Sequence, residues 1–417
     1  MKLFYIGGRD IFSVGGIENW MLHLPVALAA KGYEVTVCCE SDADGVRFYR
    51  DVRILYIKAP KSKYLRKIWA SYRATRRALQ EGCDLIHYNV WPCAVWSFLA
   101  ERKGVKTILM GHGFEWKRSK YNALQRALLR LCEAWAARRH AHIVLCSQEQ
   151  TDWYVKHYGC DGKAVTIPSA VDLPESGAAG DSRATAMDVP VEGGTAETGG
   201  VPVGAGDTAG GVSAATSDGC VGGVPAVVNE PFTLLYMGRI SPEKKVDLLI
   251  RAFARIRVER GVDARLLIAG SMDASGAYGR KIQKLIDSCE AVEYVGEVFG
   301  EEKEALLRRT RLFCLPSSVE GLSIALLEAA AHRIPVLASD IPSNREALGD
   351  DAIWVQPDDL PSLEHAFRFV FPGVSAEEDA RIQDLLDRHA RRAYDRVAAH
   401  FTWSRTLALY EEYIRSI

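Results

Sequence analysis

Short apolar runs alternate with longer amphipathic segments along most of this chain. The apolar runs predict strands, and apolar positions three or four residues apart predict helices, as at 20–31 and 124–139. In the first part of the chain we expect strands at 2–7, 35–39, 84–88, 106–110 and 142–146. In the second part we expect them at 233–238, 265–269, 292–295, 312–315 and 336–339. This alternation is typical of parallel sheets that helices cover on both faces.

The pattern starts twice, because an apolar strand that ends in glycine opens each part, at 2–7 and at 233–238. We therefore predict an α/β protein with two Rossmann-like parallel-sheet domains, at 1–173 and 231–390. Residues 391–417 are expected to form a C-terminal helix that returns to the first domain. A chain of 417 residues is long enough for two domains, each with its own core.

Residues 174–230 separate the two parts and differ from both in composition. They include 13 glycines but no aromatic residue and no lysine. Such a segment can bury too little apolar surface to offset the entropy that it would lose on ordering. We predict a disordered linker or insertion here.

Charge is divided unevenly along the chain. Residues 1–172 hold 26 Lys and Arg against 16 Asp and Glu, or +10, and the remaining residues hold 26 against 37, or −11. The two parts are therefore expected to face different partners. The ten cysteines form no C-x-x-C pair, and no apolar run approaches the ~20 residues of a membrane span. The first residues also lack the pattern of a signal peptide, so we expect a cytoplasmic protein with reduced thiols.

Two glutamates eight positions apart, Glu320 and Glu328, bracket a glycine turn and the start of an apolar helix. A helix N-terminus offers unpaired N–H groups and the positive end of a dipole to a diphosphate. Glu320 could accept hydrogen bonds from sugar hydroxyls, and Glu328, about two helical turns further on, could reach a ribose. The alternative is an amphipathic helix with two solvated glutamates.

A second candidate site follows the first strand of the second domain. Arg239 and Lys244 lie between that strand and a helix that begins near Val246. Open α/β sheets bind ligands at the carboxyl ends of their strands, where a guanidinium and an ammonium suit a diphosphate. We expect the strand order to bring this segment and Glu320 to one edge of the sheet. Solvated surface cations are the alternative.

These motifs together resemble those of the family-4 retaining glycosyltransferases, which have the GT-B fold. The resemblance rests first on G-R-I-S-P-E-K at 238–244 and on L-P-S-S-V-E-G at 315–321, followed by Glu328. Three further segments match the family in the expected order, namely its N-terminal glycine loop, the histidine after a central strand and the segment that leads to the interdomain linker. They lie at 14–18, 111–113 and 167–172.

The resemblance implies two domains that face a central cleft, with the donor's diphosphate bound from both sides. Arg239 and Lys244 would bind it with their charges, and Gly15 and Gly16 would bind it through backbone N–H groups that no Cβ shields. Family members generally need no metal for the diphosphate, so no metal and no other cofactor is expected. Positive side chains and a helix N-terminus would take the charge of the leaving group instead.

At the sugar end, the resemblance implies that His112 and Glu320 are catalytic. The residues that would contact the donor's sugar and ribose are Glu320, Gly321, Leu322, Ser323 and Glu328. Leu322 and Ser323 replace the family's aromatic residue and glycine, and Arg333 replaces a glycine that normally ends the following helix. We therefore expect a strained or differently shaped helix end at Arg333.

Residues 61–77 hold seven basic and three aromatic residues and no acid, in a largely helical pattern. A basic face with interleaved aromatic residues suits an anionic membrane surface or a lipid-diphosphate acceptor. The alternative is a solvated helix that packs its aromatic side chains into the domain. No recognised nucleic-acid module accompanies this segment, so nucleic acid is not an expected partner. Peripheral attachment to the inner face of the cell membrane stays open.

The sequence and the resemblance together favour a retaining glycosyltransferase of the hexosyltransferase type. The donor would be a UDP- or GDP-linked sugar, and the acceptor a lipid-linked or cell-surface polysaccharide or glycolipid, as in polysaccharide biosynthesis for the cell envelope. Two alternatives remain. One is a sugar-nucleotide epimerase of the same architecture, which would need further acid and base residues in the cleft. The other is a non-catalytic GT-B protein that binds a nucleotide sugar.

Overall fold

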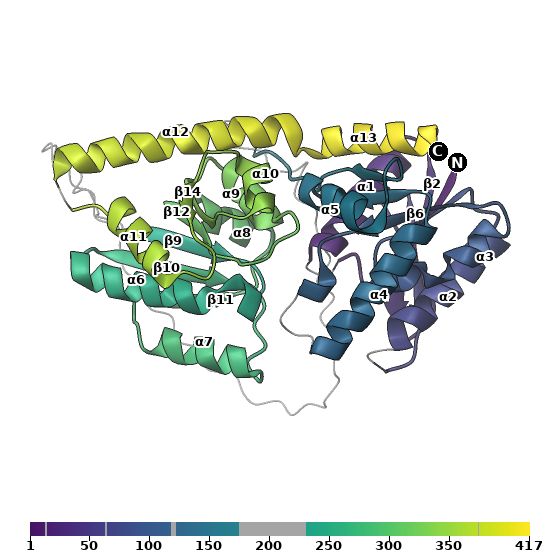
Figure 1. Ribbon diagram of the computed structural model, residues 1–417, viewed down its shortest axis with the longest axis horizontal. Coiled ribbons are helices and arrows are strands. Elements are labelled where there is room, and N and C mark those ends of the chain that lie inside the picture. Colours follow the sequence, from purple (N-terminus) through teal and green to yellow (C-terminus); the bar gives the residue numbers. More distant parts are fainter. Residues whose placement is uncertain (13–14, 63–64, 118–121, 175–230, 374) are drawn as a thin grey trace, which may run out of the picture.

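The computed structural model describes residues 1–417 except 13–14, 63–64, 118–121, 175–230 and 374. Two α/β domains lie side by side, and the last two helices run along one side of both (Figure 1). The linker expected at 174–230 lies outside the described residues, apart from Pro174.

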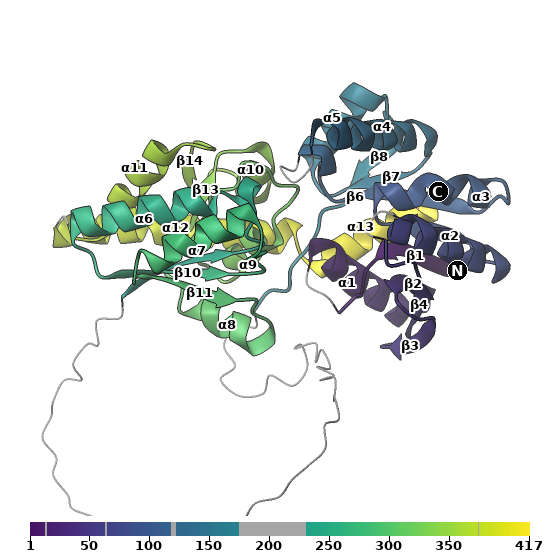
Figure 2. The ribbon, with the colours of Figure 1, turned by 90° about the horizontal axis from the view of Figure 1, so that it is seen from below.

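The first domain is built on an eight-stranded sheet in the order β3-β4-β2-β1-β5-β6-β7-β8 (Figure 2). Neighbouring strands are parallel except for β3, which is antiparallel to β4. Strands β1, β2, β5, β6 and β7 confirm the sequence prediction, whereas β3, β4 and β8 were not predicted. The strands are β1 (Lys2–Gly8), β2 (Glu34–Ser41), β3 (Gly45–Tyr49), β4 (Val52–Lys58), β5 (Leu85–Tyr88), β6 (Lys106–Gly111), β7 (Ile143–Leu145) and β8 (Ala164–Thr166).

The second domain has a six-stranded sheet in the order β11-β10-β9-β12-β13-β14, in which all the pairs are parallel. The five expected strands are confirmed, and β14 is an additional edge strand. The strands are β9 (Phe232–Met237), β10 (Ala264–Ala269), β11 (Val292–Gly296), β12 (Leu312–Leu315), β13 (Val336–Ser339) and β14 (Ile353–Val355).

Helices cover both faces of each sheet. Those of the first domain are α1 (Gly16–Ala30), α2 (Leu65–Gln80), α3 (Ser97–Glu101), α4 (Ala123–Arg139) and α5 (Gln148–Tyr158), with the 3-10 turns η1 (Trp91–Trp96) and η2 (Glu115–Lys117). Those of the second are η3 (Pro242–Lys244), α6 (Val246–Arg260), α7 (Ala277–Asp287), α8 (Gly300–Arg308), α9 (Ile324–Ala331), α10 (Pro342–Leu348), α11 (Leu360–Val370) and α12 (Ala376–His400). The chain ends with α13 (Trp403–Ser416).

Strand β1 shows why the first domain needs helices on both faces of its sheet. Phe4 and Ile6 are buried in one core, with α2, α4 and α5. Leu3 and Tyr5 are buried in the other, with α1 and α13. A strand that is apolar on both sides is stable only between two layers of helices.

The C-terminal segment returns to the first domain, but it does so later than predicted. Residues 391–400 continue α12 along the second domain, because Val397 and Phe401 are buried in the core of that domain. The chain crosses at Phe401, whose carbonyl accepts a hydrogen bond of 2.9 Å from the Val171 N–H. Only α13 then packs on the first domain, through Tyr410 and Ile414. The expectation of one returning helix over 391–417 is therefore wrong in where the return begins.

Within the described part of the chain, no helix is both long enough and apolar enough to cross a bilayer.

Candidate active site

The strand order brings the two candidate segments of the second domain together. Strand β9, which precedes Arg239, pairs directly with β12, which precedes Glu320. The chain changes direction here, since β10 and β11 lie on one side of β9 and β12 to β14 on the other. Open α/β sheets bind ligands at such a switch point. The expectation that both segments meet at one sheet edge is confirmed.

Hydrogen bonds between the two loops place Lys244 beside Glu320. The Ser318 N–H and hydroxyl both donate to the carbonyl oxygen of Glu243, at 2.9 and 3.2 Å. The Lys244 Nζ then lies 2.5 Å from the Glu320 Oε1, and the two side chains are only 13% and 8% exposed. The two loops therefore hold an ammonium and a carboxylate next to each other, with little solvent around them.

Arg239 lies on the same loop as Lys244. The Tyr236 hydroxyl donates a hydrogen bond of 2.8 Å to the carbonyl oxygen of Arg239 and so braces the backbone there. The Arg239 side chain itself is exposed at the sheet edge. Its guanidinium is therefore accessible to an anion that also meets Lys244.

Ser323 begins helix α9. Its hydroxyl is buried and accepts a hydrogen bond of 3.4 Å from the Leu326 N–H, which is the geometry of an N-cap. The substitution for the family's glycine therefore has a structural role that sequence reasoning did not assign. Leu322 packs against apolar residues of both domains. Its side chain thus contacts both domains.

Glu328, at the far end of this nine-residue segment, has a lysine partner as well. The Lys303 Nζ on α8 lies 2.8 Å from the Glu328 Oε1. Burial lowers the pKa of the Lys303 ammonium, but the Glu328 carboxylate outweighs this effect, so the pKa is raised overall and the charge is kept. Sequence reasoning missed Lys303, because nothing in the charged run around it distinguishes this lysine from its neighbours.

The end of α9 shows the expected strain. Arg333 has φ of 54°, in the left-handed region where the family has glycine. The Arg333 N–H bonds to the carbonyl of Ala330 and the Ile334 N–H to that of Ala329, which is the Schellman pattern. The Arg333 guanidinium lies 4.1 Å from the centre of the Tyr394 ring on α12. This stacking offsets part of the cost of the backbone conformation.

His112 follows β6 and lies at the face of the first domain that meets α9. Its Nδ1 is 3.5 Å from the Cys146 Sγ, and its ring packs edge-on against Trp20 at 6.2 Å between ring centres. A Cβ added to Gly321 would lie only 2.9 Å from the His112 carbonyl oxygen and 3.3 Å from the Gly113 Cα. The structure therefore brings the predicted histidine and the glutamate loop into direct backbone contact across the cleft.

The glycine loop of the first domain also faces α9. A Cβ built on Gly16 would point at the Ile324 Cγ1 from 4.0 Å. Gly15 is the N-cap of α1, and the Glu18 carboxylate folds back against it, so that an added Cβ would collide with Glu18. The N-termini of α1 and α9 thus approach each other from the two domains. Val14, in the same predicted loop, lies outside the described residues.

A separate polar contact joins the domains at α10. Both oxygens of the Glu346 carboxylate accept hydrogen bonds from the Gln148 N–H, at 2.7 and 2.8 Å, at the N-terminus of α5. Burial raises the pKa of Glu346, although these backbone hydrogen bonds act to lower it. Sequence reasoning did not single out Glu346, since its partner is a backbone group.

Among the described side chains, no three or more His, Cys, Asp or Glu lie together in a way that could hold a metal ion.

Comparison with known proteins matches each domain separately. Residues 14–175 match the family described as Glycosyltransferase Family 4, and residues 224–376 match Glycosyl transferases group 1. A curated relative, the MMP alpha-(1->4)-mannosyltransferase of Mycolicibacterium hassiacum, is 30% identical over 179 residues, which is 42% of each chain. The chain therefore spans less than half the length of the curated relatives that it matches.

Solved structures match over the whole length. The sucrose-phosphate synthase of Thermosynechococcus elongatus has a TM-score of 0.74 at 18% identity, covering 100% of this chain and 98% of that one. The Anabaena protein HepE, solved in complex with UDP-glucose, has a TM-score of 0.69 at 14% identity and full coverage of both chains. These likenesses show the GT-B fold, and the two family matches, which follow each other along the chain, show that the chain belongs to the family-4 type of glycosyltransferases.

Proposed function

We propose that this protein transfers a sugar from a nucleoside diphosphate sugar, UDP- or GDP-linked, to a glycan or lipid-linked acceptor, with retention at the anomeric carbon. The observation that carries the proposal is the pair of lysine–glutamate contacts at the two ends of 320–328. We call Glu320 with Lys244 the inner end of this segment and Glu328 with Lys303 its outer end. The inner end provides a carboxylate for sugar hydroxyls and a cation for phosphate, and the outer end provides a carboxylate for a ribose.

In this proposal the diphosphate lies between Lys244, Arg239 and the N-terminus of α9. The Lys244 ammonium, held beside Glu320, would turn from the carboxylate to a phosphate oxygen when the donor binds, and Glu320 would then accept hydrogen bonds from sugar hydroxyls. The backbone N–H groups at the N-terminus of α9 and in the glycine loop before α1 would also turn the positive ends of their dipoles toward the diphosphate. These groups would stabilise the charge of the leaving diphosphate without a metal ion.

In the transfer step, an acceptor hydroxyl oxygen forms a bond to the anomeric carbon while the bond from that carbon to the diphosphate oxygen breaks. The proton of the hydroxyl passes to the departing phosphate on the same face of the sugar, which preserves the configuration. His112 would hold the sugar from the first domain and Glu320 from the second. Both would fix the orientation in which the two oxygens share one face.

The acceptor is assigned to the first domain, next to His112. Trp116 follows this histidine and is only partly buried, and the Arg130 Cζ and the Lys117 Nζ lie 5.0 and 5.8 Å from the centre of its ring. Aromatic rings beside a cation suit a sugar or a phosphate-bearing acceptor. The excess of basic residues in this domain favours an anionic acceptor, such as a lipid-linked diphosphate presented at the cytoplasmic face of a membrane. The mannosyltransferase names among the relatives favour a hexose donor.

The test is a screen of UDP-, GDP- and dTDP-sugars for thermal stabilisation of the protein and for release of diphosphate. Glu320→Ala and Lys244→Gln are compared with the wild type, and Lys245→Gln is the matched control, because Lys245 pairs with Asp358 instead of Glu320. We expect one donor to stabilise the wild type and the control against heat, and both proteins to release diphosphate from it. In Glu320→Ala and Lys244→Gln, both the stabilisation and the release should be impaired. Stabilisation without turnover under any acceptor condition would indicate a binding protein, and no response to any donor would contradict the proposal.

A further inference from the structure

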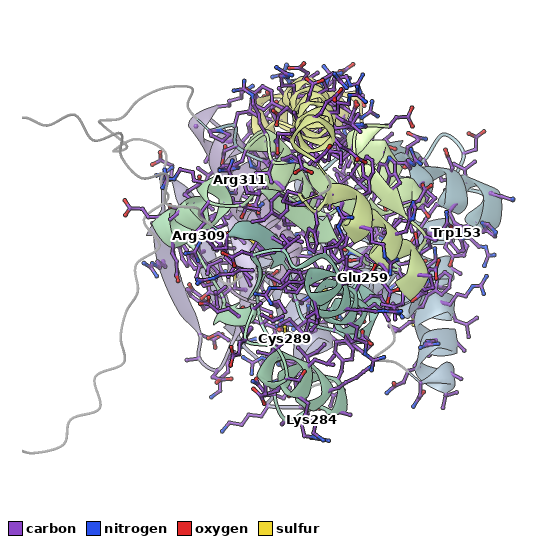
Figure 3. All side chains as sticks on the ribbon, turned by 90° about the vertical axis from the view of Figure 1, so that its left-hand side faces the viewer. Trp153, Glu259, Lys284, Cys289, Arg309 and Arg311 are labelled. Atoms are coloured by element: carbon purple, nitrogen blue, oxygen red, sulfur yellow. The ribbon has the colours of Figure 1, made fainter. Side chains whose placement is uncertain are left out.

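The first domain exposes an apolar stripe on α4. Leu124, Leu128, Leu131 and Trp135 are spaced by four, three and four residues and so share one side of the helix. Their exposed fractions are 79%, 61%, 68% and 45%. None of the residues 123–132 is buried, so the first half of α4 projects from the domain. In Figure 3 this helix extends past the outline of the second domain.

Helix α2 and η1, which lie next to each other, expose further apolar residues. Leu65, Ile68 and Trp69 of α2 are 59%, 38% and 51% exposed, and Val95 of η1 is 37% exposed. Turn η1 packs against both α2 and α4, and the Trp96 Nε1–H donates a hydrogen bond of 2.9 Å to the Ile68 carbonyl. We call these residues the apolar face, which consists of Leu65, Ile68, Trp69, Val95, Leu124, Leu128, Leu131 and Trp135.

The structure separates the aromatic residues of the basic segment 61–77. Tyr72 packs against Trp96, with 4.9 Å between ring centres, whereas half of the surface of Trp69 is exposed. Tyr64 lies outside the described residues. The sequence left open whether these aromatic residues pack into the domain or face its surroundings. Tyr72 packs against the domain, whereas Trp69 is half exposed.

Basic residues outnumber acidic residues on the two helices that carry the apolar face. Helix α4 carries four exposed arginines, and its one acidic residue, Glu133, is buried. Helix α2 contains no acidic residue from Leu65 to Gln80. The exposed arginines of α4 are Arg126, Arg130, Arg138 and Arg139. With about 3.6 residues per turn, Arg138 and Arg139 lie on either side of the apolar stripe, whereas Arg126 and Arg130 lie on the other side of the helix. Exposed leucine and tryptophan with arginines beside them are typical of a helix that lies in the headgroup region of a bilayer.

We propose that the apolar face docks the first domain on an anionic phospholipid bilayer, with its leucine and tryptophan side chains in the interface and the arginines at the headgroup phosphates. The charge pattern selects this partner over a second copy of the chain. In a symmetric dimer the same positive surface would meet itself, and like charges would oppose each other. The second domain, with its excess of acidic residues, would face away from the lipid.

The experiment measures sedimentation of the full-length protein with vesicles, without donor or acceptor. Vesicles of phosphatidylcholine alone are compared with vesicles that also contain phosphatidylglycerol, at low and high salt. We expect the wild type to sediment with the anionic vesicles, and we expect high salt to weaken this association. The double variant Leu128→Glu/Leu131→Glu should lower the association by about tenfold or more, because two inserted side chains are lost and two repelling charges are added.

The control is Val258→Glu, which also replaces an exposed apolar side chain by a carboxylate, but on α6 of the second domain, at a residue that is 76% exposed. It should sediment as the wild type does. Absence of wild-type association with anionic vesicles would overturn the proposal, and so would unchanged association of the double variant. A wild-type dimer that the double variant dissociates, as measured by light scattering, would assign the apolar face to self-association instead. Since the assay involves no sugar donor, its outcome does not depend on the proposed transferase activity.

Discussion

The two ends of the segment 320–328 differ in how the protein surrounds them. At the inner end, Glu320 and Lys244 are almost fully buried, and the first domain closes over them through the contact between Gly321 and His112. At the outer end, Glu328 and Lys303 are 20% and 29% exposed, and both come from the second domain. The first domain therefore covers the inner end by direct backbone contact, whereas the outer end is a partly exposed ion pair between two helices of the second domain. We expect the inner end to control the rate of transfer and the outer end to control donor binding.

Gly321→Ala would break the inner end and should have the largest effect. The added methyl group would lie 2.9 Å from the His112 carbonyl oxygen, and backbone cannot give way as a flexible side chain does. The domains would have to move apart, and a displacement of about 1 Å at a reacting centre costs on the order of a hundredfold in rate. Donor-dependent diphosphate release by the variant and the wild type measures this loss.

The matched control for this substitution is Gly45→Ala, where an added Cβ would meet only Tyr56 at ordinary contact distance. It should keep the wild-type rate. If Gly321→Ala also keeps it, closure of the two domains does not limit the reaction, and the difference between the two ends loses its basis.

Lys303→Met tests the outer end, with a smaller expected effect. Glu328 would keep its place on α9 but lose the ammonium that holds its carboxylate. We expect the KM for the donor to rise by about tenfold with kcat changed by less than about twofold, which is the pattern of lost ground-state binding. Lys303→Arg should recover most of the affinity. A fall in kcat at unchanged KM would instead give the outer end a role in the transfer step.

Most of the strands could be predicted from the sequence because they are buried apolar runs. The inner end could be predicted because parallel strands place the loops at their carboxyl ends at one edge of the sheet. Knowing that Arg239 and Glu320 each follow a buried strand was enough to expect them near each other, and β9 and β12 are indeed neighbours. The antiparallel strand β3 escaped prediction, because its Val46 and Phe48 are exposed and belong to no buried run.

The partners of Glu328 and Glu346 could not be predicted in the same way. Lys303 reaches Glu328 only because of how α8 is rotated about its axis, and charged residues occur all around that helix. Glu346 binds backbone N–H groups of α5, which every sequence has. Contacts that depend on helix rotation or on backbone groups leave no residue pattern along the chain.

The pH dependence of stability probes the support behind the outer end. The His332 Nε2 lies 2.8 Å from the Glu304 Oε2 next to Lys303. Burial lowers the pKa of His332, but the hydrogen bonds to the Glu304 carboxylate and the Glu328 carbonyl, together with the charges of these two glutamates, outweigh it, so the pKa lies above the usual 6.5. The imidazolium therefore adds stability that is complete below pH 6.5 and is lost as the pH rises through the raised pKa.

His332→Gln should accordingly destabilise the protein more at acidic than at alkaline pH, by a difference of up to about 1 kcal/mol. Urea unfolding at several pH values measures it. His142→Gln is a suitable comparison, because burial lowers the pKa of His142, and its contribution should change with pH in the opposite sense. Equal destabilisation by His332→Gln at all pH values would mean that the charge of His332 does not support α9.

Arg333→Gly should have the smallest effect, because two contributions at the end of α9 nearly cancel. Glycine would relieve the left-handed backbone by about 1 kcal/mol, but it would also remove the guanidinium from the Tyr394 ring, which contributes about 0.5–1 kcal/mol. In a Tyr394→Leu background the second contribution is already gone, so there the same substitution should stabilise the protein by about 1 kcal/mol. Urea unfolding of the four proteins gives the coupling between the two residues. If Arg333→Gly is equally destabilising in both backgrounds, the ring does not offset the strain, and the arginine has another role at this end of the site.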